Sequence, residues 1–210
     1  MPASGGSTLR SAFHAAAHYY LPNGEWPDVS RSASAYEREL KGILQGEAEA
    51  LRGYARGRSE RDRAVLGRLG RSPFLVVRAA GSLGFDLVAL RNEFAFPLEV
   101  KASRTDTIRF SAASGRAAQQ LEAHRKAVDR VGLVVLYAYR RLGLRGTEDP
   151  WRMFIAPAPP GRGRLDLLRR RLPEVAQTKD GNGVLRWNDG MGLVDFLDLV
   201  GFLTEPPEGA

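Results

Sequence analysis

The chain has 210 residues, of which 43% are hydrophobic and 26% are charged. That length is enough for one domain with a buried core, and the composition excludes a disordered chain. The absence of cysteine excludes a disulfide scaffold and thiolate metal sites. The longest apolar run, residues 131–139, is too short to cross a bilayer, and no long apolar stretch stands near the N-terminus. We therefore expect a cytoplasmic protein that makes no membrane contact.

Arginine dominates the basic residues. Lysine and arginine together number 31 against 24 acidic residues, which gives a net charge of +7, and all but four of the 31 are arginine. A GC-rich genome accounts for much of the arginine count, but it does not account for the net charge. Guanidinium groups bind phosphate oxygens through paired hydrogen bonds. The charge therefore favours a nucleic-acid partner.

The chain opens with segments that carry little core-forming pattern. Residues 1–8 are small and polar and are expected to be disordered. Residues 9–20 favour a short helix, which a stretch with two prolines and a glycine ends. Ser32 or Ser34 can cap a helix over residues 35–45. The apolar stripe of that helix is formed by Tyr36, Leu40, Ile43 and Leu44.

The next segment, residues 46–72, is helix-like and strongly basic. Between Arg52 and Arg71, seven arginines stand against Glu60 and Asp62, a local balance of +5. The dipeptide Ser72-Pro73 ends the helix. A solvated helix face with no ligand is the simplest interpretation, and a phosphate-binding surface is the alternative.

The rest of the chain predicts an α/β fold with a mixed sheet and helices on its faces. The apolar, β-branched run at 131–139 indicates a central strand. In chain order, we expect strands over 74–77, 85–90, 94–101 and 108–111, a helix over 114–130, strands over 131–139 and 151–156, a linker over 157–163, and a helix over 195–203.

Two neighbouring strands bring acidic residues together. Strand alternation puts Glu99 and Lys101 on one face, while the side chains on either side of Glu99 are apolar and belong to the core. The connection between the strands is short, so the strand that holds Asp86 is an antiparallel neighbour and Asp86 can approach Glu99. Two carboxylates at one point repel each other, and oxygen ligands around a cation indicate Mg²⁺ or Mn²⁺.

This set of residues is typical of a metal-dependent phosphodiesterase. Asp86 and Glu99, with the carbonyl of Val100, would hold the metal, which would polarise the scissile phosphate and lower the pKa of a bound water. Lys101 would orient that water and stabilise the charge that develops on the phosphate. The alternative is a surface ion pair between Glu99 and Lys101, with Asp86 at a strand end.

Several segments resemble one nuclease family. They are similar to motifs of the archaeal Holliday-junction resolvases of the PD-(D/E)xK nuclease superfamily. The strongest are Arg78-Ala79-Ala80-Gly81-Ser82, Asp86-Leu87-Val88-Ala89 and Leu98-Glu99-Val100-Lys101, and weaker ones are Tyr36-Glu37-Arg38-Glu39-Leu40, Trp151-Arg152-Met153-Phe154 and residues 119–130 and 178–187. The resemblance covers roughly residues 35–200. It implies a single domain with a restriction-endonuclease-like mixed β-sheet flanked by helices.

The resemblance also implies roles for further residues. Glu37 matches an acidic residue on the first helix that completes the metal site, and Ser82 matches a polar residue that contacts the scissile phosphate. Arg38 and Arg78 match basic residues that bind DNA phosphates. The family passes from this helix to its first strand in far fewer residues than this chain does, so Glu60-Arg61-Asp62-Arg63 is an alternative to Glu37. Glu37 is preferred because it lies beside a clean apolar stripe.

By the same resemblance, residues 35–204 form the nuclease domain. Residues 1–34 are then an extension of unassigned role, and residues 205–210 a disordered tail. Residues 46–72 become an arginine-rich helical insertion, and its positive charge is the basis for expecting that it grips a DNA arm outside the active site. The arginines expected to bind phosphates there are Arg56, Arg58, Arg61 and Arg63.

The expected activity is the resolution of four-way DNA junctions by Mg²⁺-dependent hydrolysis, with Mn²⁺ as a substitute, in a nucleoid-associated cytoplasmic protein. A junction has two equivalent scissile strands, so a two-fold homodimer is expected. Its interface is expected to be apolar, and the family resemblance makes residues 121–131 and the strand that follows the candidates for it. Another nuclease of the same fold, such as a nickase or mismatch endonuclease, and an inactive junction-binding scaffold are the alternatives. His14 and His18 have zinc-ligand spacing, but no third ligand follows them.

Overall fold

A computed structural model describes residues 33–79, 84–110, 116–144, 147–158 and 163–204. The predicted helix over 9–20, His14 and His18, Ser82 and the C-terminal tail lie outside these residues. The described residues all belong to one compact unit. Among the described helices, none combines the length and the apolar character that a bilayer span requires.

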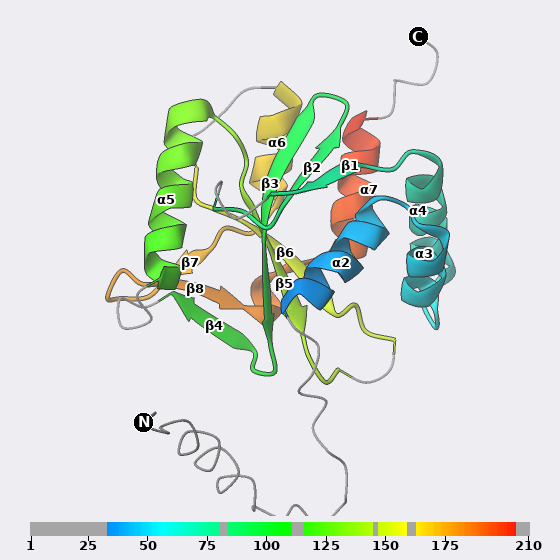
Figure 1. Ribbon diagram of the computed structural model, residues 1–210, viewed down its shortest axis with the longest axis horizontal. Helices are drawn as coiled ribbons and strands as arrows, with labels where there is room; N and C mark the ends of the chain where they lie inside the picture. Colours follow the sequence, from blue (N-terminus) through cyan, green and yellow to red (C-terminus); the bar gives the residue numbers. More distant parts are fainter. Residues whose placement is uncertain (1–32, 80–83, 111–115, 145–146, 159–162, 205–210) are drawn as a thin grey trace, which may run out of the picture. The chain divides into compact units, whose positions relative to one another are not determined.

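The centre of the fold is a six-stranded mixed sheet with the order β1-β2-β3-β5-β6-β9 (Figure 1). Only β3 and β5 run parallel, and every other neighbouring pair is antiparallel. The chain between β3 and β5 forms the crossover that a parallel pair requires. The strands are β1 (Leu75–Arg78), β2 (Leu87–Arg91), β3 (Phe94–Ser103), β5 (Leu136–Arg141), β6 (Trp151–Ile155) and β9 (Met191–Gly192).

Helices cover both faces of this sheet. One face packs against α2 (Ala33–Leu44), α4 (Glu60–Arg71), α6 (Gly163–Arg171) and α7 (Leu193–Thr204). The other face packs against α5 (Arg116–Val131) and a small sheet of β4 (Thr107–Phe110), β8 (Gly183–Arg186) and β7 (Ala176–Gln177). Figure 1 shows α5 on one side of the sheet and α2, α3 (Ala48–Ala55), α4 and α7 on the other. The predicted fold class, a mixed sheet flanked by helices in one domain, is confirmed, and it is consistent with a restriction-endonuclease-like architecture.

The hairpin between β2 and β3 positions the acidic residues. Its register pairs Leu87 with Leu98 and Arg91 with Phe94. Asn92 in the turn has φ of 51°, a left-handed conformation that asparagine tolerates better than most residues. The alternation of β3 is as predicted, because Leu98 lies in the core on the α2 side while Glu99 and Lys101 point the other way, toward α5.

Some predicted elements differ from the structure. The basic segment is two helices, α3 and α4, with Gly57 in a left-handed conformation between them and Ser59 capping α4. The central strand begins at Leu136 rather than at residue 131, because α5 continues to Val131. Helix α6 was not expected beside the proline- and glycine-rich linker, nor were strands β7, β8 and β9.

Two apolar side chains of the dimer surface predicted at residues 121–131 are not available to a second copy of the chain. Leu121 and Val128 are buried within the protomer, where they pack on the sheet side of α5. The strand that follows lies between β3 and β6 and is itself buried. Its apolar side chains are therefore already used inside one copy of the chain.

Candidate active site

Asp86 and Glu99 face each other across the start of the β2–β3 hairpin. Asp86 precedes β2, and its backbone N–H donates to the carbonyl of Leu98, 3.0 Å away. Its side-chain Oδ2 accepts the N–H of Val100 at 2.7 Å. The carboxylate thus replaces the backbone partner that Val100 of β3 lacks where the chain has not yet entered β2. The predicted approach of Asp86 to Glu99 follows directly from this antiparallel register.

Lys101 completes the cluster. Its ammonium donates to Glu99 Oε1 at 2.6 Å, and the side chains of Lys101 and Glu99 are 23% and 4% exposed. The two residues do form an ion pair, as the simpler alternative supposed, but the pair is not on the surface. A half-buried pair of this kind is held in one geometry by its surroundings, which an exposed pair is not.

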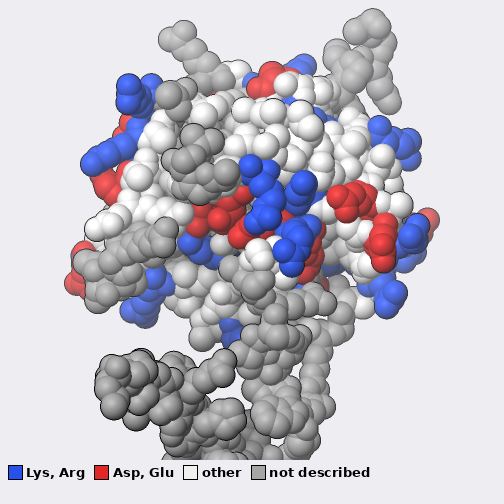
Figure 2. Space-filling view, in the orientation of Figure 1, with Lys and Arg blue, Asp and Glu red and all other residues white. Residues whose placement is uncertain are grey.

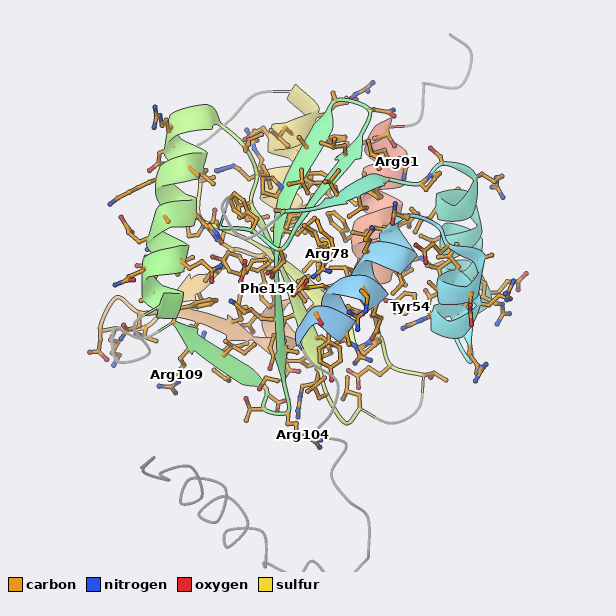
Figure 3. All side chains as sticks on the ribbon, in the orientation of Figure 1. Tyr54, Arg78, Arg91, Arg104, Arg109 and Phe154 are labelled. Carbon is orange, nitrogen blue, oxygen red and sulfur yellow. The ribbon has the colours of Figure 1, made fainter. Side chains whose placement is uncertain are left out.

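Glu37 lies close to the same cluster. Its Oε2 accepts from the Arg78 guanidinium at 2.6 Å, which joins α2 to the end of β1. Figure 3 shows Arg78 where α2 crosses the sheet. The Glu37 charge raises the pKa of Asp86, whereas the charges of Lys101 and Arg78 lower it. The structure therefore brings Glu37, Arg78, Asp86 and Lys101 within electrostatic reach of one another. Arg38, one residue on, is exposed, and its guanidinium donates to Ser34 Oγ at 3.3 Å.

Burial dominates the electrostatics of the two central carboxylates. It raises the pKa of Asp86, opposed chiefly by the Val100 N–H. It also raises the pKa of Glu99, which the Lys101 ammonium lowers and the Asp86 charge raises further. Both pKa values are raised for the same reason: each negative charge is held out of water with too few hydrogen-bond donors around it. A bound cation would remove that cost.

Helix α5 supplies two polar side chains that sequence analysis did not single out. Gln120 Oε1 accepts from the Lys101 ammonium at 3.1 Å, and its Nε2 donates to the carbonyl of Gly84 at 3.1 Å. His124, one turn further, lies 2.7 Å from the same carbonyl and 2.7 Å from the Tyr137 hydroxyl. The sequence did hold a signal for both residues. Glu99 and Lys101 had to face the crossover helix, and Gln120 and His124, four residues apart, lie on one face of that helix.

The alternative acidic residues lie elsewhere. Glu60 and Asp62 begin α4, which packs against α7. Asp62 lines a surface pocket with Asp149 and Asp195. No described contact joins Glu60 or Asp62 to Asp86 or Glu99. The geometry around Asp86 therefore favours Glu37.

The four arginines predicted to bind DNA outside the site have different surroundings. Arg56 and Arg63 are exposed, although Arg63 also donates to the carbonyl of Arg58 at 2.6 Å. Arg58 is 7% exposed and donates to the carbonyl of Tyr54 at 2.7 Å, with its guanidinium over the Tyr54 ring. Arg61 pairs with two carboxylates of α7, at 2.8 Å and 3.0 Å. On the face that Figure 2 shows, basic side chains are likewise interspersed with acidic ones.

The donor set suits a hard divalent cation. Glu99 Oε2 is buried and has no partner at full hydrogen-bond geometry, although the nearby Gln120 amide lowers the Glu99 pKa. The carbonyl of Val100 points to the same side of β3 as its N–H, toward Asp86, because both groups of a strand residue face one neighbour. Within the described residues, no three acidic or histidine side chains form a metal cluster by themselves. Mg²⁺ does not require one, since it is usually held by one or two carboxylates together with water and substrate phosphate.

Comparison with known proteins adds little at this distance. No protein-family model matches the chain, and no curated protein matches it. The structure is similar to the 1.6 Å structure of Hjc, a Holliday junction resolvase from the archaeal hyperthermophile Archaeoglobus fulgidus. The two share 18% identity over 65% of this chain and 92% of the other, with a TM-score of 0.39. A likeness this remote carries no argument about activity, which must rest on the site itself.

Proposed function

We propose that this protein is a metal-dependent endodeoxyribonuclease of the PD-(D/E)xK type, and that it resolves four-way DNA junctions. The observation that carries the proposal is the half-buried cluster of Asp86, Glu99 and Lys101 at the start of one hairpin. It combines the carboxylate of Asp86 with that of Glu99, which has one buried oxygen without a partner and accepts from the Lys101 ammonium with the other at 2.6 Å. The motif resemblance around these residues supports the same class of enzyme.

Each residue has a distinct task in this proposal. Asp86, Glu99 and the Val100 carbonyl would hold Mg²⁺, with Glu37 close by; Mn²⁺ would substitute. When bound, the cation polarises the scissile phosphate and lowers the pKa of a water. Lys101 orients the attacking water or stabilises charge on the phosphate through the one donor that Glu99 and Gln120 leave free. Arg38 and Arg78 flank this point and bind neighbouring phosphates, without reading sequence.

A junction-binding scaffold without activity is less well supported. A buried carboxylate oxygen without a partner costs about 1–3 kcal/mol of folding free energy. A protein that only binds DNA gains nothing from that cost, and apolar side chains in place of both Glu99 and Lys101 would remove it. Junction specificity, as opposed to cleavage of forked or nicked duplexes, rests on the motif resemblance.

The proposal is tested by cleavage assays on four-way, forked and duplex DNA with Mg²⁺ and with EDTA. We expect Mg²⁺-dependent cutting, fastest on the four-way junction. Lys101→Ala should reduce the rate roughly 10²- to 10³-fold, the scale of losing one charge-stabilising donor. Glu99→Gln should reduce it at least as much while DNA binding is retained, because the acidic residues serve the chemistry and oppose the phosphate charge.

Lys126→Ala is the matched control, since Lys126 is an exposed lysine on α5 with a side chain that is 75% exposed. It should cut at the wild-type rate. Wild-type cleavage by Lys101→Ala would overturn the assignment of the site. Cleavage restricted to forked or nicked DNA would keep the nuclease and refute junction resolution.

A further inference from the structure

Both ends of the Gln120 amide are engaged, and they reach the two sides of the candidate site. Oε1 accepts from the Lys101 ammonium at 3.1 Å, and Nε2 donates to the Gly84 carbonyl at 3.1 Å. Gly84 lies two residues before Asp86. One side chain of α5 therefore touches both the lysine on β3 and the turn that leads into β2.

The first contact limits the freedom of the lysine. A lysine side chain has a long flexible stem and three donors, and holding it in one rotamer costs up to about 2 kcal/mol of conformational entropy. Glu99 and Gln120 each accept one donor of Lys101, so two of the three are fixed. The third is left for a water or a phosphate oxygen, in a direction that the first two determine.

The second contact fixes the turn before Asp86, and His124 reinforces it. A carbonyl oxygen can only accept, so His124 Nε2 carries the proton that it donates to Gly84, and Nδ1 accepts from the Tyr137 hydroxyl. The two lone pairs of the Gly84 carbonyl are thus matched by donors from Gln120 and His124. The Phe85 ring stacks on the His124 ring with centroids 4.4 Å apart. Backbone and side-chain contacts with α5 therefore hold the segment immediately before Asp86.

From these contacts we infer that Gln120 is a positioning residue, which sets the direction of the Lys101 ammonium relative to Asp86 by bridging Lys101 and Gly84. An amide is suited to the position because it offers an acceptor to the lysine and a donor to the carbonyl. A carboxylate would keep the first contact and lose the second, and an apolar side chain would lose both. The inference deepens the proposed nuclease function and rests on it for its catalytic consequence.

The test compares Gln120→Met and Gln120→Glu with Gln119→Met. Gln119 is the adjacent residue of α5 and is exposed, so it provides a matched control. Single-turnover cleavage of bound junction DNA should fall on the order of 10- to 100-fold in Gln120→Met, the scale expected for a misplaced catalytic group. Affinity for the same DNA should not change, and Gln119→Met should match the wild type. A wild-type cleavage rate in Gln120→Met, or an equal loss in Gln119→Met, would overturn the inference.

A second measurement does not depend on activity. The chain has only four lysines, so the extent of acylation of Lys101 at one pH can be measured by peptide mass spectrometry, with Lys126 as the internal reference. Lys101 should be acylated faster in Gln120→Met than in the wild type, and Gln120→Glu should restore the protection. Equal acylation in all the proteins would refute the bridge. If the wild type does not cleave DNA, the proposed function fails, and the acylation result still decides the bridge.

Discussion

Glu37 on α2 is one candidate for the helix-borne acidic residue of the site, and Glu60 and Asp62 on α4 are the alternatives. Only Glu37 acts on the electrostatics of Asp86, and it is tied to the sheet through Arg78. We predict that Glu37→Gln lowers the cleavage rate roughly 10- to 100-fold, the usual cost of losing a group that supports a metal ligand. Cleavage of a labelled four-way junction at saturating enzyme measures this.

Glu60→Gln and Asp62→Asn are the paired controls, because both residues lie at the start of α4. They should retain the wild-type rate. The reverse pattern would identify α4 as the first helix of the nuclease fold and would make α2 an appendage.

The buried His124 predicts a pH dependence of stability. Burial lowers its pKa, with the Lys101 charge acting in the same direction and the Gly84 carbonyl opposing it. The unfolded chain therefore binds the proton first, near pH 6.5, so the stabilisation is present above that pH and is lost as the pH falls toward the lowered folded pKa. When the pH is lowered from 7.5 to 5.5, the unfolding free energy of the wild type should fall by up to about 1 kcal/mol more than that of His124→Gln.

Urea denaturation of both proteins at the two pH values measures this difference. Other titrating groups are common to the two proteins and cancel. An identical loss of unfolding free energy in both proteins would mean that His124 is charged in the folded state at pH 5.5.

At the scale of elements, the basic segment has two kinds of arginine. Arg58 lies between α3 and α4 with its guanidinium 3.6 Å from Asp149 and over the Tyr54 ring, whereas Arg56 at the end of α3 is exposed. We predict that Arg58→Gln lowers the unfolding free energy by about 2–3 kcal/mol, because Asp149 is left with an uncompensated charge. Arg56→Gln should change it by less than about 0.5 kcal/mol.

Chemical denaturation of the two variants decides between a structural and a ligand-binding role for Arg58. An Arg58→Gln protein of wild-type stability and weakened DNA binding would show that its contacts with Tyr54 and Asp149 contribute nothing to the fold. It would then support the phosphate contact expected from the sequence.

Local patterns predict the hairpin at the site but not the contacts that tie it to other elements. Alternation from Phe94 to Lys101 determines which side chains enter the core, so the face of Glu99 could be predicted without a structure. Asp149 lies in a stretch that the sequence marks only as a loop. Its carboxylate accepts from the N–H of Trp151 and Val194 and from the Tyr54 hydroxyl, contacts between residues up to 95 apart that no local pattern encodes.

The contribution of α5 to the site could not be predicted for the same reason, because its contacts join residues that are distant in the sequence. Gln120 and His124 lie on a helix that is predicted correctly, but their partners on β3 and before β2 depend on how the crossover docks. Helix α6 was missed because it is rich in arginine and follows a proline- and glycine-rich stretch, so its sequence favours a loop until Leu168 packs into the core. Tertiary packing overrides weak local preference in both cases.

At the scale of the whole molecule, the proposed substrate requires two cuts. One copy of the chain has one cluster of Asp86, Glu99 and Lys101, so two symmetric cuts need two copies. Leu121 and Val128 of α5 and the apolar residues of β5 do not supply the contact, because they are buried in the protomer. Exposed apolar side chains remain on the edge strand β1, where Leu75 and Val77 are 62% and 50% exposed.

The last prediction follows from that symmetry. In a dimer with one site per subunit, a wild-type subunit paired with a Glu99→Gln subunit cuts one strand only. Refolding the wild type with an excess of Glu99→Gln should therefore shift the products of a supercoiled cruciform plasmid from linear to nicked DNA, since the intact site still acts. The same excess of Lys126→Ala should leave linear DNA as the main product. Gel electrophoresis separates the two forms. An unchanged ratio of linear to nicked DNA, with exchange of subunits verified by differently tagged copies, would show that single copies of the chain cut independently and that the two-fold homodimer is not the active form.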